Sequence, residues 1–234
     1  MVDLLEYRYA YLVGNLLLFI IWIIIFLRRK DLRKEQLVVG MILAFVAPLT
    51  DYLFFYNDYW RPDYFFNFQI NNVRLGFESS FFGFVIGGIS TGIYEFVLGR
   101  KAIFSKPRNL LAFLVAFINL FGIYVLTNLG LNSIWSSIIT LIGCSIYMAL
   151  KDRDLIKDMI FSSIFITTII FIFYIVWFYI YPLALHKFWV IDNLSGIKIW
   201  RTPIEEIVWF FSAGLFIGTF YEFWRNVRKY KKLS

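Results

Sequence analysis

The chain has 234 residues, of which 60% are hydrophobic and only 17% charged, far from the roughly 45 to 50% and 25% of soluble proteins. It carries 28 Phe, 15 Tyr and 8 Trp, more apolar surface than a water-soluble domain of this length can bury. A soluble globular protein is therefore excluded. The single cysteine, Cys144, and the single histidine, His186, exclude cysteine-ligated metal sites and histidine clusters. We expect no metal and no cofactor, and assign neither residue a role.

Apolar runs long enough to cross a bilayer as helices occur seven times along the chain. They cover residues 11–27, 36–55, 77–98, 109–129, 133–150, 159–181 and 203–224. The first run is followed by a basic segment, RRKDLRKEQ, rather than by the small residues of a signal-peptide cleavage site. We therefore expect it to remain as a membrane span.

Basic residues are distributed unevenly over the segments that connect these runs. The segments after the first, third and fifth runs, together with the C-terminal tail, carry seventeen Lys and Arg residues, against six on the other side. By the positive-inside rule, the N-terminus is outside and the C-terminus lies in the cytoplasm of the cell. The net charge of +7 follows from this topology and from contact with anionic membrane lipids, so no nucleic-acid partner is expected.

The two longer loops on the outer side, residues 56–76 and 183–202, are rich in aromatic residues. Trp and Tyr prefer the headgroup region of a membrane. The loops therefore have two interpretations, a belt that anchors the protein at the interface or a lid over a cavity that opens to the membrane.

The chain contains an internal repeat. At a spacing of 127 residues, 74–96 aligns with 201–223, which places Glu78 on Glu205 and ends both segments in Tyr-Glu-Phe. At a spacing of 123 residues, 31–35 aligns with 154–158, and with small gaps Trp60 approaches Trp189. The sequence thus predicts an all-α integral membrane protein with seven transmembrane helices in a 3+1+3 parallel repeat.

This arrangement divides the chain into a first three-helix repeat, 1–108, a linking helix, 109–132, and a second three-helix repeat, 133–234. The linking helix restores the second copy to the orientation of the first. The two copies of a parallel repeat are related by rotation about the membrane normal, and a shared site is expected between them.

The glycines of the third span in each copy follow the small-xxx-small spacing of closely packed helices and form no dinucleotide-binding loop.

Each copy of the third span carries acids at both ends. Glu95 and Glu222 close the inner ends, where we expect them to form interfacial salt bridges with Arg100 or Arg225. Glu78 opens the span in the first copy, about 25 Å from the inner acid at 1.5 Å per residue. The two ends therefore cannot act on one atom.

The outer acids of the second copy, Glu205 and Glu206, follow Pro203, a residue suited to the first turn of a helix. They have two interpretations, solvated charges at a helix N-terminus or acids partly buried in an apolar pocket that donate a proton. Consecutive helical residues point about 100° apart, so only one of them can face a cavity squarely. A deeper acid, Asp51, has three candidate partners, Arg74, Arg201 or an acid that shares its proton, and the sequence does not decide among them.

Without metal ligands, a nucleotide motif or a nucleophile–base pair, the remaining chemistry is proton transfer to an apolar substrate that enters from lipid. A carboxylic acid that protonates a polyene makes a carbocation, which aromatic faces stabilise by about 0.5 to 2 kcal/mol each. We expect the cavity in the outer half, with substrate contacts from five aromatic residues: Phe81, Phe82, Trp189, Trp209 and Phe210.

These residues resemble a family, the membrane-integral lycopene cyclases, which carry a Pro-x-Glu-Glu/Asp motif at the start of a span. Here the motif reads Pro203-Ile204-Glu205-Glu206, preceded by the aromatic loop with Trp189 and followed by the Gly-to-Tyr-Glu stretch of the same span. The resemblance implies cyclisation of a linear carotenoid end group without net redox change, with Glu205 and Glu206 as the acids. In the first copy, Glu78 stands without the proline and the second acid, and we expect it to hold or deprotonate the cation. The partners would be an apolar polyene or isoprenoid lipid and membrane lipids, and homo-oligomerisation is left open.

Two alternatives come from other classes, a small-solute transporter with parallel three-helix repeats and a non-enzymatic lipid-binding or sensory protein. A transporter needs a polar site at the middle of the membrane, where this chain has few polar residues, among them Asn119. A retinal-binding rhodopsin is excluded because no span has a lysine in its interior.

Overall fold

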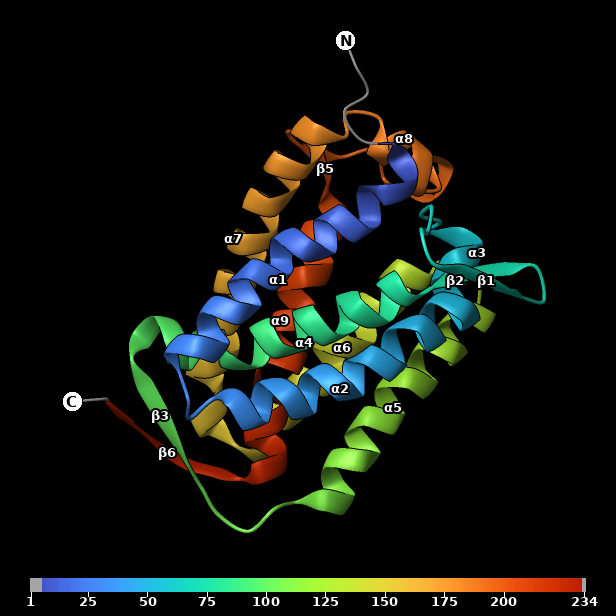
Figure 1. Ribbon diagram of the computed structural model, residues 1–234. Coiled ribbons are helices and arrows are strands. Elements are labelled where there is room, and N and C mark those ends of the chain that lie inside the picture. The colour runs from blue at the N-terminus through green and yellow to red at the C-terminus, as the bar shows by residue number, and fades with distance from the viewer. Residues whose placement is uncertain (1–5, 233–234) are drawn as a thin grey trace.

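The computed structural model describes residues 6–232. Within them, seven helices are long and apolar enough to cross a membrane, as the sequence predicts (Figure 1). They are α1 Ala10–Arg28, α2 Arg33–Thr50, α4 Phe77–Leu98, α5 Asn109–Asn128, α6 Ser133–Lys151, α7 Ile156–Ile180 and α9 Ile204–Arg225. The chain is therefore an all-α integral membrane protein.

Short elements join these helices. A π-helical turn, Asp51–Phe55, and α3 (Tyr56–Asp58) extend α2, and α8 (Ala184–Phe188) follows α7. The described residues also form three two-stranded antiparallel sheets, which the hydrophobic pattern does not predict. They are β1 Asn67–Ile70 with β2 Val73–Gly76, β3 Arg100–Phe104 with β6 Val227–Lys232, and β4 Lys198–Ile199 with β5 Thr202–Pro203. The first hairpin turns at Asn71 and Asn72, both at positive φ, as tight two-residue turns require.

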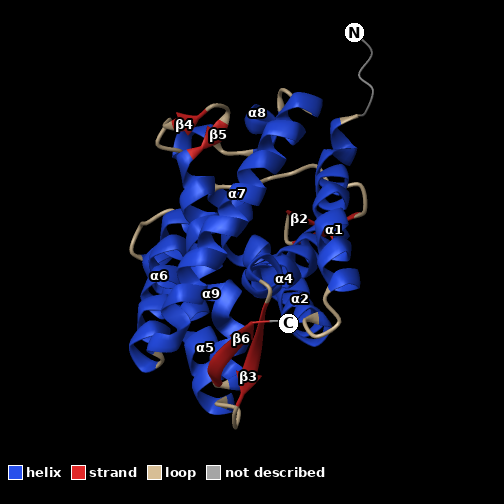
Figure 2. Ribbon diagram, turned by 90° about the vertical axis from the view of Figure 1, so that its left-hand side faces the viewer, coloured by secondary structure: helices blue, strands red, loops and turns tan. Residues whose placement is uncertain are grey.

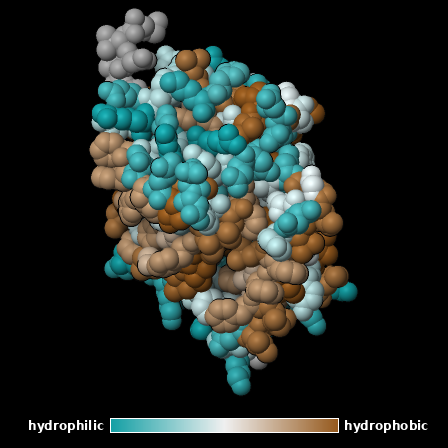
Figure 3. Space-filling view, turned by 90° about the vertical axis from the view of Figure 1, so that its right-hand side faces the viewer, coloured by the Kyte–Doolittle hydropathy of each residue, from teal (hydrophilic) through white to brown (hydrophobic). Residues whose placement is uncertain are grey.

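The surface matches a protein surrounded by lipid. Hydrophobic residues form a broad band, with hydrophilic residues gathered toward the two ends of the molecule (Figure 3). On α5, large side chains such as Leu110, Phe113 and Phe117 are more than half exposed. In water such exposure would be unfavourable, whereas in a bilayer it is the ordinary outer face of a spanning helix.

The helices pack in a pattern that supports the repeat, which itself stays a prediction. Within the first proposed copy, α4 packs against α1 and α2; within the second, α9 packs against α6 and α7. The places where the backbones of two helices approach most closely also correspond between the two proposed copies. A Cβ on Gly87 would lie 3.2 Å from the Cα of Gly40, and one on Gly214 would lie 2.5 Å from the Cα of Ser163. Small residues at equivalent places thus let the second and third helices of each copy approach closely.

Corresponding segments of the two proposed copies also pair with each other. Strands β3 and β6, which follow α4 and α9, are antiparallel neighbours at one end of the bundle, called here the β3–β6 end (Figure 2). Trp60 and Trp189 form an antiparallel bridge at the opposite end, called the α8 end. Antiparallel pairing of corresponding segments is what a twofold axis between the proposed copies would produce.

Candidate active site

A cavity of about 240 Å³ lies among helices of both proposed copies. Its walls come from α1, α2 and α4 on one side and from α6, α7 and α9 on the other, with part of α5. Most of the lining side chains are aliphatic or aromatic. Of the described residues that line it, two are acids, Glu206 and Asp51, whereas Glu95 and Glu222 are not part of the wall.

Glu206 is held in this wall by three hydrogen-bond donors. Its Oε1 accepts bonds from the Tyr59 hydroxyl and from Nε1–H of Trp189, the latter at 2.9 Å. Its Oε2 accepts a bond of 2.5 Å from the Tyr174 hydroxyl. The donors lie on three different segments, the loop after α3, the loop after α8, and α7. The carboxyl group is therefore both buried and fixed in orientation.

Tyr59 is suited to donate rather than to lose its proton. Burial, together with the nearby Glu206 carboxyl group, raises the pKa of the Tyr59 hydroxyl well above its usual range. The phenol thus stays protonated at physiological pH. A protonated phenol stabilises a carboxylate by a charge-assisted hydrogen bond, one of the stronger kinds in proteins.

The aromatic loops cover the cavity at the α8 end. The rings of Trp60 and Trp189 meet edge to face at a centroid distance of 4.3 Å, and both line the cavity. Backbone bonds on either side, Arg61 N–H to the Phe188 carbonyl and Val190 N–H to the Tyr59 carbonyl, join the two loops. Trp189 is buried, so of the two interpretations of these loops the geometry favours a lid at this position.

Glu205 and Glu78 are buried but do not line the cavity. Glu205 Oε1 accepts the Ser195 backbone N–H at 2.6 Å, and Glu78 Oε1 accepts the backbone N–H groups of Phe65 and Phe66 at 2.7 and 3.2 Å. These two acids are equivalent in the proposed repeat, and each accepts hydrogen bonds from the loop that precedes its own helix. Adjacent residues on α9 thus face different surroundings, as the 100° helical rotation requires.

A second polar group lines the cavity in the first copy. Asp51 lies at the start of the π-helical turn after α2, and its Oδ2 accepts a 2.5 Å bond from the Ser79 hydroxyl. The spacing of 127 places Ser79 on Glu206, and the spacing of 123 places Asp51 on Tyr174. In both proposed copies, the same pair of positions therefore holds a carboxyl group and a hydroxyl group. The two groups are exchanged between the second and third helices. Among the described residues, neither Arg74 nor Arg201 pairs with Asp51.

Four of the five aromatic residues expected at the cavity line it: Phe82, Trp189, Trp209 and Phe210. Phe81 does not, since it packs against Phe19 at a centroid distance of 5.2 Å. Its neighbour Phe82, on α4, contacts Phe210, on α9, at a ring-centroid distance of 6.4 Å. Sequence reasoning missed Tyr59 and Tyr174. Tyr174 could have been found, because the 123-residue spacing aligns it with the one acid inside the second span.

The expectation for the inner acids was wrong. Glu95 and Glu222 are fully buried, and among the described residues neither forms an ion pair with Arg100 or Arg225. Arg100 instead donates to the Tyr94 hydroxyl, and the Arg225 guanidinium lies over the Phe104 ring. The two helices bring these carboxyl groups inward, toward each other, rather than out to the interface.

Comparison with known proteins identifies a family. The family model described as "Lycopene cyclase" matches residues 8–97 and 132–224. The two matched segments hold α1, α2 and α4, and α6, α7 and α9, and they leave out α5. No curated protein and no solved structure matches the chain.

Proposed function

Because this chain belongs to the lycopene cyclase family, whose match supports carotenoid cyclisation in general, we propose that it cyclises the end group of a linear carotenoid by acid catalysis at Glu206. The observation that carries the proposal is a buried carboxyl group, fixed by three donors, in the wall of an apolar cavity. The substrate is an apolar isoprenoid in the membrane. A small polar solute would find few partners among these walls, which speaks against the transport alternative.

The hydrogen bonds around Glu206 suggest which oxygen carries the transferable proton. A carboxylate oxygen accepts two hydrogen bonds through its lone pairs. Oε1 already accepts two, from Tyr59 and Trp189, whereas Oε2 accepts one, from Tyr174. The proton therefore resides on Oε2. The three donors stabilise the carboxylate that remains after the proton has left.

In the proposed reaction, the Oε2–H bond breaks as the proton adds to the terminal double bond of the end group, leaving a tertiary carbocation. A neighbouring double bond attacks that carbon, which forms the ring bond and moves the positive charge within the new ring. Loss of a proton from an adjacent carbon restores a double bond. Atoms and electrons balance as an isomerisation, with no oxidant or reductant. The faces of Trp209 and Phe210 stabilise the cation, each by about 0.5 to 2 kcal/mol.

We propose that Asp51 accepts the proton that the cyclic carbocation loses in the last step. It is the second acid of the cavity wall, and it lies on the opposite copy from Glu206. In its ionised form, held by the Ser79 hydroxyl, it would attract the cation and accept its proton. In this scheme Glu78 and Glu205 hold the loops and do not touch the substrate.

The cavity volume fits one end group rather than the whole substrate. Pockets for drug-sized ligands span about 300 to 1,000 Å³, larger than this cavity of about 240 Å³. The rest of the polyene must therefore lie outside. We propose that it leaves between α2 and α5, because Ile42 and Leu120, one from each helix, both line the cavity and Ile42 is also 40% exposed.

The test is to express the full chain with a linear carotene and to separate the products by chromatography. Glu206→Gln keeps the size and the hydrogen-bond acceptor but has no transferable proton, so cyclic product should fall by at least the roughly 10²- to 10⁴-fold that general acid catalysis contributes. Asp51→Asn should also reduce cyclisation, whereas Glu205→Gln, in protein that remains monodisperse, should keep most of it.

Two outcomes would contradict the proposal. If Glu205→Gln lost activity while Glu206→Gln kept it, the donor would be the other acid. If the unmodified protein made no cyclic product where a known cyclase does, the enzymatic interpretation would give way to a non-enzymatic lipid-binding protein.

A further inference from the structure

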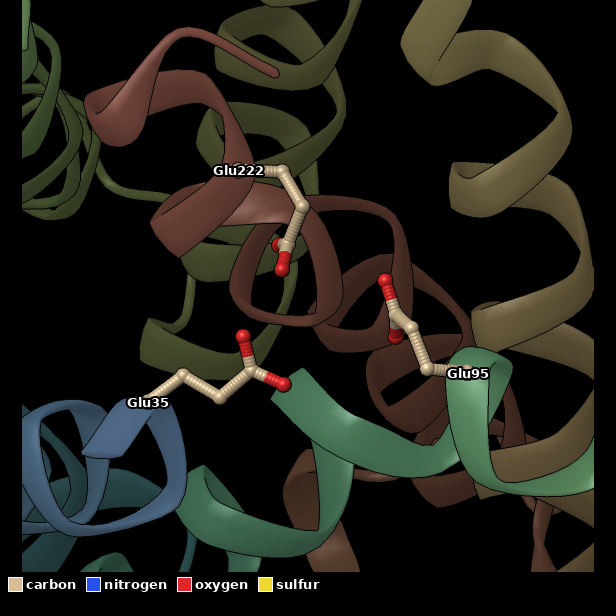
Figure 4. Close-up of side chains that lie close together, drawn as sticks. All are labelled: Glu35, Glu95 and Glu222. Carbon is tan, nitrogen blue, oxygen red and sulfur yellow. The ribbon is translucent and has the colours of Figure 1, made fainter. Parts of the chain in front are cut away.

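A second cluster of acids lies at the β3–β6 end, away from the cavity. Glu35 of α2, Glu95 of α4 and Glu222 of α9 point toward one another (Figure 4), and one carboxylate oxygen of each lies within 4.8 Å of the others. All three side chains are buried, with Glu95 and Glu222 fully so. Three helices thus aim carboxyl groups into one closed volume.

The carboxyl groups of this cluster lack the usual partners. Both oxygens of Glu95, both of Glu222 and Oε1 of Glu35 are buried without a hydrogen-bond partner outside the cluster among the described residues, and within it the side chains of Glu35 and Glu222 interact with each other. The nearest basic group does not supply one, since Arg29 donates to the Asp31 carboxylate and to the backbone carbonyls of Glu95 and Arg100. Buried charges without a partner are strongly unfavourable in proteins. As carboxylates, these oxygens therefore need a ligand that the described residues do not provide.

Asp158 of α7 adds a fourth acid beside the three. It is fully buried, its Oδ1 accepts a 2.9 Å bond from the Ser162 hydroxyl, and it interacts electrostatically with all three glutamates. Glu35 and Asp158 are equivalent at the 123-residue spacing, and Glu95 and Glu222 at the 127-residue spacing. Each proposed copy thus contributes two acids, one from its second helix and one from its third.

We propose that Glu35, Glu95 and Glu222, with Asp158 beside them, bind one hard divalent cation of the Ca²⁺ or Mn²⁺ class. Carboxylate oxygens are the ligands that these ions prefer. Ca²⁺ holds its oxygens at about 2.3 to 2.6 Å, so oxygens on opposite sides of one ion lie about 5 Å apart. The oxygens of the cluster are already within that spread, and a small inward movement brings all three to coordination distance.

The ion would join the two proposed copies at the β3–β6 end of the bundle, opposite the aromatic loops. Its ligands would come from α2 and α4 of the first copy and from α9 of the second, so it would fix α4 against α9 on that side of the cavity. This role is structural and independent of the proton chemistry at Glu206. Failure of the metal proposal and failure of the proposed function can therefore be told apart.

The experiment uses the full chain in detergent, treated with EDTA, dialysed and titrated with Mn²⁺. Bound ion is measured by loss of the electron paramagnetic resonance signal of free Mn²⁺, and the thermal unfolding midpoint is recorded with and without Mn²⁺ or Ca²⁺. The unmodified protein should bind about one ion per chain and unfold at a higher temperature when the ion is present, as a ligand of the folded state requires. Glu95→Gln and Glu222→Gln should each weaken binding at least tenfold.

Asp154→Asn is the matched control, since Asp154 is an exposed acid at the same end of the molecule. It should bind Mn²⁺ as the unmodified protein does. If Glu95→Gln or Glu222→Gln does not fold, Glu35→Gln provides the same comparison at a less enclosed ligand. The proposal is overturned if the unmodified protein shows no saturable binding and no ion-dependent rise in its unfolding temperature. That result would mean that the acids are neutral and share protons.

Discussion

Removal of one hydrogen bond to Glu206 gives a graded test of the proposed acid. Tyr174→Phe deletes the hydroxyl that donates to Oε2 and leaves the ring, which stacks on Phe178, in place. A hydrogen bond to a charged group contributes about 1.5 to 3 kcal/mol. If the hydrogen bond strengthens as Glu206 loses its proton, removal of the Tyr174 hydroxyl raises the activation free energy by about 1.5 to 3 kcal/mol. Each 1.36 kcal/mol corresponds to a tenfold change in rate. The expected loss is therefore roughly ten- to 150-fold.

The assay is the initial rate of cyclic product formation in membrane vesicles, normalised to folded protein. Tyr181→Phe is the matched control, because Tyr181 is also buried but its hydroxyl has no hydrogen-bond partner among the described residues. Removal of that hydroxyl should leave the rate unchanged. Equal rates for Tyr174→Phe and Tyr181→Phe, in variants of equal thermal stability, would refute the reasoning, since the hydroxyl at Oε2 would then contribute nothing to proton transfer.

Two further predictions concern packing and topology. Gly83→Ala should lower the unfolding temperature, because its Cβ would lie 2.2 Å from the Leu43 carbonyl oxygen, and overpacking of this kind costs about 1 to 3 kcal/mol. Gly143→Ala is the control, since nothing lies within 4 Å of a Cβ at Gly143, and equal unfolding temperatures would contradict the packing argument. For topology, a cysteine at Asp192 should react with a membrane-impermeant maleimide in intact cells and one at Lys30 should not. The reverse pattern would place the N-terminus in the cytoplasm.

Much of the fold could be predicted from the sequence because lipid imposes a simple rule. Every span must form its backbone hydrogen bonds internally, as a helix does, and must present apolar side chains to lipid over about 30 Å. Hydrophobic length alone therefore located all seven helices within a few residues of their ends. The three small sheets could not be found this way. They lie in the connecting segments, where hairpin turns such as Asn71–Asn72 and pairing between distant strands decide the structure.

The proposed site could be anticipated only in part. The acids after Pro203 had two interpretations, solvated charges at a helix N-terminus or acids in an apolar pocket, and helical geometry required that only one of Glu205 and Glu206 could face a cavity squarely. The loops decide which of the two acids faces the cavity. The Ser195 backbone N–H donates to Glu205, whereas the Trp189 side chain donates to Glu206 in the cavity wall. No local pattern contains that choice.

The sequence by itself determined the number of spans, its own alignment at spacings of 127 and 123 residues, and the presence of acids at both ends of α4 and α9. Those features follow from hydrophobicity and spacing, which are local properties of the chain. Only the tertiary structure decided that Tyr59, Tyr174 and Trp189 converge on one carboxyl group, and that Glu35 meets Glu95 and Glu222 rather than the arginines next to them in sequence. The physical reason is that helix packing, set by close approaches such as Gly214 to Ser163, fixes which faces of distant helices meet.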